Sequence, residues 1–336
     1  MKQLAFKPRW LLIALTVLAL GLGAVACEEE EKAPAPTPAL RVALLLPGTI
    51  DDFGYNAMGK RALDAAKEQL GAEVAFTESV PVPTQADVYR RFASQGFDLV
   101  IGWGGQFTDG AVEVAKEFPN VRFFVVNSNV GNETNVGSFD TDVQDWQFVG
   151  GFVVANLSKS GVVGWVGGQC FPATAKNLHG TEQGAKFANA NIRFLSTFTG
   201  DFEDPVKAQQ AAQAMIEQGA DVLTGNLNNG WFGVFEAARA AGIPVVTEWF
   251  DNHDQAPDVI ASSILKDHSR FLVEIVRAAI EGNFPARFQL FGLPPDWGPA
   301  VSDTDLLPDE TYNDALSVQD KIVAGEIDAK EDTNCP

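Results

Sequence analysis

From Leu40 onward the chain alternates short apolar runs with helical stretches of about 12 to 16 residues. The runs that we expect to form strands are Arg41–Leu46, Glu73–Phe76, Leu99–Gly102, Arg122–Asn127, Gly161–Val166, Ile192–Thr197, Val222–Thr224, Pro244–Thr247 and Val259–Ser263. The expected helices are Ala57–Leu70, Ala111–Phe118, Asp145–Ser158, Gly180–Asn189, Asp204–Gln218, Phe232–Ala241, Asp267–Glu281 and Glu310–Val323. Continuous apolar runs are typical of parallel strands that are buried on both faces. The alternation therefore predicts an α/β fold with doubly wound sheets and right-handed crossovers.

The strand and helix pattern restarts after Lys159–Gly161, which predicts two Rossmann-like lobes. A chain of 336 residues is also at the upper size limit of a single core. Two open sheets that face each other create a cleft at the carboxyl ends of their strands, where such sheets bind ligands. No low-complexity linker separates the halves, so we expect a hinge made of strand crossings.

Composition indicates a globular, acidic protein. The chain is 46% hydrophobic, contains 24 Phe and seven Trp, and has a formal net charge of −20. Binding to nucleic acid requires clustered Lys and Arg, so the charge argues against a nucleic-acid partner. It equally disfavours attachment to anionic lipid through the protein's own surface charge.

The first 26 residues read as a secretory signal peptide. Three basic residues precede an uncharged apolar run from Trp10 to Leu22, and the small-residue stretch Gly23–Ala26 follows. Cys27 comes directly after these small residues, an arrangement that resembles the lipobox of bacterial lipoproteins, although Ala24 stands where Leu is usual. We expect Cys27 to be lipidated and to become the mature N-terminus. The alternative is an uncleaved transmembrane anchor, which the short apolar run disfavours.

Residues 27–38 form an acidic, proline-rich segment that cannot bury a core and that we expect to act as a tether. Removing residues 1–26 takes away three positive charges and no negative ones, which changes the formal charge from −20 to −23. The sequence thus predicts a soluble domain held by a lipid at the outer face of the cell membrane.

The sequence lacks the motifs of common catalytic sites. It contains no Gly-x-Ser-x-Gly and no phosphate-binding loop, and Gly102–Phe107 fails the dinucleotide fingerprint at its last glycine. The three histidines are scattered, and three cysteines with no Cys-x-x-Cys pair cannot supply a four-ligand zinc site. We therefore expect no enzyme, no metal and no cofactor.

Polar and aromatic residues instead follow the ends of the predicted strands. These candidate ligand-binding residues are Asp52, Tyr55, Asn56, Trp103, Asp109, Trp231, Phe232, Trp249, Asp251 and Lys266. An aromatic residue is as often part of the core as of a site, but four such loops combine an aromatic with Asn, Asp or Lys. Aromatic faces stack on planar rings, and nearby carboxylates and amides can bind hydroxyl groups.

The ordered set of stretches from Arg41 to Gly298 resembles the basic membrane protein family of bacterial lipoproteins. The best-matched pieces include Asp51–Asn56, Glu117–Phe123, Ser160–Gly168, Gln218–Val222 and Gly233–Ala238. The resemblance implies a type I periplasmic binding protein fold and a nucleoside-binding component of an ABC importer. With this fold we expect one lobe to comprise residues 39–140 plus about 265–290, and the other residues 141–264 plus about 291–336.

The resemblance also implies roles for individual residues. In such proteins two aromatics sandwich a purine base, which here corresponds to Tyr55 in one lobe and Trp231 or Phe232 in the other. An acidic residue and a lysine bind the ribose hydroxyls, and Asp251 and Lys266 match these positions.

Two segments depart from the family pattern. The family's usual Gly-Val-Asp-Ser-Asp-Gln is here Thr247–Asn252, so that Trp249 replaces the first acidic residue. The crossing segment Phe139–Asp142 also differs from its usual form.

Cys170 and Cys335 remain once Cys27 is lipidated. In an exported protein they either pair or stay as free thiols, and a bond would hold the polar tail Asp328–Pro336 against the loop after Val166.

We therefore expect a lipid-anchored solute-binding protein that closes two lobes around a purine nucleoside and delivers it to ABC permease subunits. The alternatives are a binder of a sugar or another small planar metabolite, a ligand-sensing surface receptor, and a nucleoside hydrolase. The sequence gives no metal cluster or identifiable base for hydrolysis.

Overall fold

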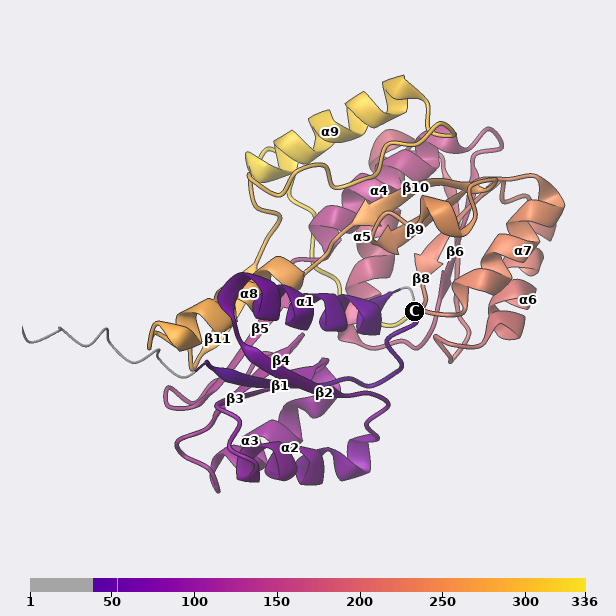
Figure 1. Cartoon of the computed structure of the whole chain (residues 1–336). Coiled ribbons are helices and arrows are strands. Elements are labelled where there is room, and N and C mark those ends of the chain that lie inside the picture. The colour runs from indigo at the N-terminus through magenta and orange to yellow at the C-terminus, as the bar shows by residue number, and fades with distance from the viewer. Residues whose placement is uncertain (1–38, 53) are drawn as a thin grey trace, which may run out of the picture. The chain divides into compact units, whose positions relative to one another are not determined.

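The computed structural model describes residues 39–52 and 54–336 (Figure 1). Strands and helices alternate through this part of the chain and build two parallel sheets. The predicted signal peptide, Cys27 and the tether lie outside the described residues. Among the described helices, none is long and apolar enough to cross a membrane.

The first sheet has the strand order β11-β5-β4-β3-β1-β2. Its strands are β1 Arg41–Leu45, β2 Glu73–Thr77, β3 Leu99–Trp103, β4 Arg122–Val126, β5 Val136–Thr141 and β11 Phe288–Phe291. Its helices are α1 Tyr55–Leu70, α2 Gln85–Ser94, α3 Thr108–Ala115 and α8 Ser269–Ile280. Successive residues of a strand point to opposite faces of the sheet. In β1, Val42 and Leu44 pack on the side of α1 and α8, whereas Ala43 and Leu45 pack on the side of α2 and α3. Figure 1 shows these two helix pairs on opposite faces of the sheet.

The second sheet has the strand order β10-β9-β8-β6-β7. Its strands are β6 Val162–Gly167, β7 Arg193–Phe198, β8 Val222–Asn226, β9 Val245–Trp249 and β10 Ile260–Leu265. Its helices are α4 Gln144–Leu157, α5 Pro172–Ala188, α6 Pro205–Glu217, α7 Trp231–Ala241 and α9 Asp309–Val323. The α4 and α9 helices share one apolar core cluster, and α6 and α7 share another.

The chain passes between the two sheets in three segments of the described residues. The first joins β5 to α4, the second joins β10 to α8, and the third leaves β11 and leads to α9. The structure confirms the predicted α/β fold with two doubly wound parallel sheets.

The sequence did not predict β5, β11 or α2. Gly137, Ser138 and Asp140 interrupt the apolar run of β5, and β11 has only four residues, Phe288–Phe291. The α5 helix begins at Pro172, eight residues before the expected start at Gly180. The prediction missed its first two turns because they carry polar side chains, which interrupt the apolar pattern.

A disulfide joins Cys170, which follows β6, to Cys335 in the C-terminal tail, with 5.9 Å between the two Cα atoms. The tail also lies along α5, where His179 Nε2 is 2.9 Å from the carbonyl oxygen of Asn334 and Gln183 Nε2 donates to the carbonyl oxygen of Lys330. The tail is therefore fixed to the second sheet at several points.

We predict that Cys335→Ser lowers the free energy of unfolding by about 2–4 kcal/mol, because the bond restricts the unfolded chain. Urea denaturation followed by tryptophan fluorescence measures this change. Reductant should destabilise the wild type by the same amount and leave the variant unchanged. A wild type that reductant does not destabilise would contradict the prediction.

Candidate functional site

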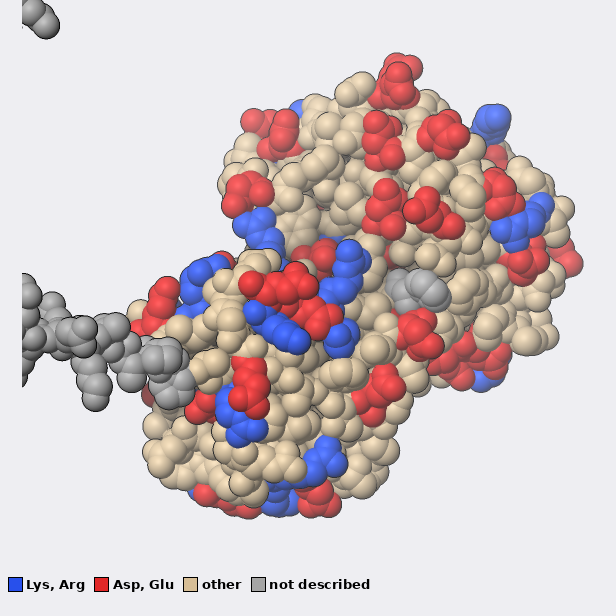
Figure 2. Space-filling model, viewed as in Figure 1, with Lys and Arg blue, Asp and Glu red and all other residues tan. Residues whose placement is uncertain are grey.

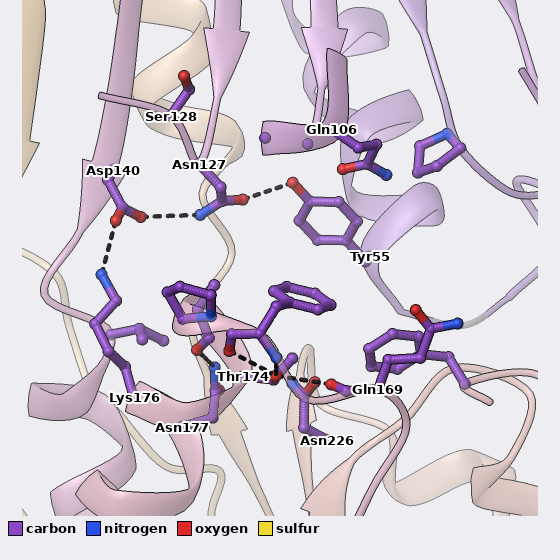
Figure 3. Close-up of a pocket in the computed structure, with 18 of the residues that line it drawn as sticks. Tyr55, Gln106, Asn127, Ser128, Asp140, Gln169, Thr174, Lys176, Asn177 and Asn226 are labelled. Carbon is purple, nitrogen blue, oxygen red and sulfur yellow. Dashed lines mark hydrogen bonds and ion pairs between the residues drawn. The ribbon is translucent and has the colours of Figure 1, made fainter. Parts of the chain in front are cut away.

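A cavity of about 980 Å³ lies where the loops at the carboxyl ends of strands from both sheets meet. On the first sheet's side its lining includes Tyr55, which begins α1, and Asn127, which follows β4. On the second sheet's side it includes Gln169, which follows β6, and Asn226, which ends β8. In Figure 3, Tyr55 and Asn127 lie on one side of the cavity, and Gln169 and Asn226 lie on the other.

Asp52 and Asn56 shape the loop that carries Tyr55. The Asp52 carboxylate accepts backbone N–H groups of Gly54, Asn56 and Ala57 at 2.9–3.0 Å, and so satisfies the first turn of α1. The Asn56 side chain accepts the N–H of Gly48 and donates to Asp52. Asn56 lines the cavity, whereas Asp52 does not, because its oxygens point into the helix start.

Tyr55 is held by two tryptophans. Its ring lies 5.6 Å from that of Trp103 and 5.5 Å from that of Trp249. Trp103 is fully buried, and its indole N–H donates to the carbonyl oxygen of Tyr55 at 2.8 Å. Trp103 therefore supports the site from behind rather than lining it.

Trp249 ends β9 with φ of +80°, a conformation that is unfavourable for a bulky side chain. The indole packs with the core cluster of α1 and α8, across from its own sheet. Strained backbone of this kind clusters at functional sites, and Trp249 lines the cavity.

A chain of polar contacts runs from Tyr55 to Lys176 (Figure 3). The Tyr55 hydroxyl donates to Asn127 Oδ1 at 2.5 Å, and Asn127 Nδ2 donates to Asp140 Oδ1 at 3.2 Å. Asp140 Oδ2 then pairs with Lys176 Nζ at 2.7 Å. Burial, together with the Asp140 charge, raises the pKa of Tyr55 well above its usual value, so the phenol stays neutral and donates.

Lys266 lies under the cavity and does not line it. Its side chain is fully buried and pairs at 2.6 Å with the equally buried Glu248. Its ammonium also lies 4.0 Å from the ring centroid of Trp249 and donates to Asn177 Oδ1. Burial lowers the pKa of Lys266 and raises that of Glu248, and the attraction between the two charges opposes both shifts.

The ion pair between Lys266 and Glu248 positions the side-chain amides of Asn226 and Asn177, which line the cavity. Glu248 accepts from Asn226 and from Gln147, and Gln147 also donates to Asn177 Oδ1 at 2.7 Å. Close packing of α4 and α5 brings Gln147 and Asn177 together, since a Cβ atom on Gly184 would lie 1.9 Å from the carbonyl oxygen of Phe148.

His268 follows β10 and lines the cavity with only 1% of its surface exposed. Aromatic rings of Phe139, Trp146, Trp249 and Phe271 surround it at 6.0–6.5 Å between centroids. Burial, and then the nearby Lys266 charge, lower its pKa to about 3. The imidazole is therefore neutral at physiological pH.

The structure brings three of the predicted ligand-binding residues into the cavity lining: Tyr55, Asn56 and Trp249. The others do not line it: Asp52, Trp103, Asp109, Trp231, Phe232, Asp251 and Lys266.

The surroundings of Trp231, Phe232, Asp109 and Asp251 explain why these four residues do not line the cavity. Trp231 is buried in the core of α6 and α7 and stacks on Phe235 with 5.9 Å between centroids. Phe232, at 39% exposure, makes an edge contact with the same Phe235. Asp109 is exposed in the first turn of α3, and exposed Asp251 accepts the backbone N–H of His253.

Sequence reasoning missed several lining residues, namely Asn127, Asp140, Phe171, Lys176, Asn177, Phe202 and His268. Asn127 and His268 follow strands, so the rule used for the other loops could have found them. Lys176 and Asn177 lie inside α5, and no sequence signal marks them. Among the described residues, no group of three His, Cys, Asp or Glu side chains could hold a metal ion.

The sequence profile of the family described as "ABC transporter substrate-binding protein PnrA-like" matches residues 39–333. The chain belongs to this family. Members of this family are solute-binding components of ABC transporters rather than enzymes, as the sequence predicted. Membership implies a small-molecule ligand, permease partners and an extracytoplasmic location.

Relatives of this substrate-binding protein include a purine-binding protein of Brucella abortus, 25% identical over 86% of this chain and 82% of that protein. Basic membrane protein A of Borreliella burgdorferi is 27% identical over 69% of this chain and 70% of that protein. The solved ABC transporter solute-binding protein of Conexibacter woesei is 25% identical, with a TM-score of 0.71 over 87% of this chain and 99% of that one. These similarities confirm the predicted family and the type I periplasmic binding protein fold.

We predict that Lys266→Met lowers the free energy of unfolding by about 3–5 kcal/mol, because it leaves Glu248 buried without its counter-ion. Adding Glu248→Gln should restore part of this loss, since no charge is then buried alone. Chemical denaturation of both variants measures the difference. The exposed Lys159→Met is the control and should change stability by less than about 0.5 kcal/mol. A double variant less stable than Lys266→Met would refute this account.

The low pKa of His268 predicts a loss of stability in acid. The folded state keeps His268 neutral down to about pH 3, whereas the unfolded state takes up the proton near pH 6.5. The contribution of His268 to the free energy of unfolding is therefore fully present above pH 6.5, and it decreases as the pH falls below that value. Relative to His268→Phe, the wild type should lose about 2 kcal/mol between pH 6.5 and pH 5. Parallel pH profiles of the two proteins in urea denaturation would contradict the prediction.

Proposed function

We propose that this protein binds a purine nucleoside in the cavity between its two sheets and delivers it to the permease of an ABC importer. We also propose that a lipid on Cys27 holds it at the outer face of the cell membrane.

The observation that carries the proposal is the presence of aromatic rings from both sheets' sides in the cavity lining. Tyr55 comes from the first sheet, and Phe171 and Phe202 follow β6 and β7 of the second. The rings of Phe171 and Phe202 lie 6.0 Å apart, and Phe171 is 42% exposed. A purine base between Tyr55 and this pair would cover the exposed ring and gain stacking energy. A cavity of about 980 Å³ has ample room for a nucleoside.

The charges of the cavity favour an uncharged ligand. Among the described lining residues, the carboxylates of Asp140, Asp201, Glu203 and Glu331 outnumber the single lysine, Lys176, which is already paired with Asp140. Phosphate groups would meet repulsion and no free cation. Acidic side chains are also spread over the visible face in Figure 2. A nucleoside therefore suits the cavity better than a nucleotide.

Two further points support the proposal. The relative from Brucella abortus is named a purine-binding protein, and this chain aligns with 82% of its length. The sequence around Cys27 has the signal, small residues and cysteine of a lipoprotein precursor.

We predict that Tyr55→Ala weakens nucleoside binding by about 10- to 100-fold, because the variant loses the stacking ring and its contact area. Isothermal titration with adenosine, guanosine and inosine measures the affinity. Tyr55→Phe keeps the ring, loses only the hydrogen bond to Asn127, and should bind within about tenfold of the wild type. Wild-type affinity in Tyr55→Ala would exclude Tyr55 from the site, and a wild type that binds no nucleoside would refute the proposed ligand.

A further inference from the structure

Three buried polar groups that line the cavity lack a hydrogen-bond partner among the described residues. They are the indole N–H of Trp249, both ring nitrogens of His268 and the hydroxyl of Thr141. Trp249 is 8% exposed, His268 is 1% exposed and Thr141 is fully buried. Buried polar groups are nearly always paired in native proteins, and each unpaired one reduces stability. Other buried groups of the described residues are also unpaired, among them the indoles of Trp146, Trp165 and Trp231, but these three belong to the cavity lining, where a ligand can supply the partners.

Thr141 and His268 stand at crossings between the sheets, and Trp249 ends β9 beside His268. Thr141 ends β5 where the chain first crosses, and His268 precedes α8 at the second crossing. The rings of Trp249 and His268 are 6.1 Å apart, and Phe139, two residues before Thr141, lies 6.5 Å from His268.

The three groups have the hydrogen-bond donors and acceptors that pair with hydroxyl groups. Trp249 donates only, whereas a neutral imidazole donates at one nitrogen and accepts at the other, and the Thr141 hydroxyl can do both. A hydroxyl of a ligand also donates and accepts, so neighbouring hydroxyls can satisfy all three groups. A phosphate would offer acceptors alone and leave the acceptor nitrogen of His268 unpaired.

The charges around these groups are already neutralised. Asp140, Lys176 and Lys266 are the charged residues that influence His268. Asp140 is paired with Lys176, and Lys266 is paired with Glu248. No free charge is therefore available here to bind an ionic group, which again favours a neutral one.

We infer that Trp249, His268 and Thr141 form a subsite for the hydroxyl groups of the ligand's sugar. This inference rests on the proposed function and replaces the expected pair of Asp251 and Lys266, which lie outside the cavity lining. Neutral donors and acceptors, rather than a carboxylate and a lysine, then recognise the sugar.

The test compares adenosine with 2′,3′-dideoxyadenosine, which lacks both ribose ring hydroxyls, in isothermal titrations of the mature protein. His268→Phe keeps a buried ring, and Thr141→Val keeps the shape of the side chain, but each removes polar atoms. Each variant should bind adenosine about tenfold more weakly or worse and bind the dideoxy analogue within about twofold of the wild type.

Thr224→Val is the matched control. Thr224 is equally buried, but its hydroxyl donates to the carbonyl oxygen of Val246 within the second sheet and does not line the cavity. This variant should bind both compounds as the wild type does. Circular dichroism and a thermal melt establish that all three variants are folded.

The subsite is refuted if His268→Phe and Thr141→Val bind adenosine like the wild type, or if they lose affinity for both compounds equally. If the wild type binds neither compound, the purine proposal fails, and D-ribose becomes the probe. A thermal shift by D-ribose that His268→Phe abolishes would then support the subsite without the purine. The absence of any such shift would overturn it.

Discussion

The buried ion pair between Glu248 and Lys266 is the interaction on which the floor of the cavity depends. Glu248 belongs to β9, and Lys266 directly follows β10 at a crossing between the sheets. Two charges removed from water need each other and further hydrogen bonds, and Asn226, Gln147 and Asn177 supply them. The pair therefore fixes side chains from β8, α4 and α5 in one arrangement. The amides of Asn226 and Asn177 face the cavity in consequence, so that a wholly buried network determines what a ligand meets.

A second set of contacts joins the two sheets. Tyr55 begins α1 and Asn127 follows β4 of the first sheet, Asp140 is the second-last residue of the adjoining strand β5, and Lys176 lies on α5 of the second sheet. Trp249 adds an aromatic contact from β9 to Tyr55. Separation of the sheets would break these contacts and expose aromatic surface. A ligand that touches both sides would favour the closed arrangement through its greater affinity for it, which is the property that a solute-binding protein requires.

The sequence was most informative where burial leaves a continuous pattern. Apolar runs predicted the central strands, because both faces of those strands are covered by helices. The pattern could not predict β5, where Gly137 and Asp140 interrupt the run, although Asp140 proved central to the site. Reading the loops after strand ends found Tyr55 and Trp249, but the same rule selected Trp231, which faces the core. An aromatic at the start of a helix packs inward or lines a cleft according to the helix's rotation, and composition alone does not determine that rotation. Lys176 and Asn177 reach the cavity from a helix, and their position depends on how closely α5 packs on α4.

The residue at position 249 explains why Lys266 does not line the cavity. The resemblance places an acidic residue at this position, where it would share the cavity with the lysine. Here an indole covers the ammonium group at 4.0 Å, and Glu248, one residue earlier on the opposite face of the strand, takes over the role of counter-ion. Because successive strand residues point to opposite faces, this shift moves the charge pair from the cavity into the interior. The space in front of Lys266 is then lined by an indole N–H and a neutral imidazole. Neutral groups of this kind distinguish ligands by the directions of their hydrogen bonds rather than by charge. Of the segment Thr247–Asn252, Trp249 lines the cavity, so the segment presents an indole there where the family pattern has a carboxylate.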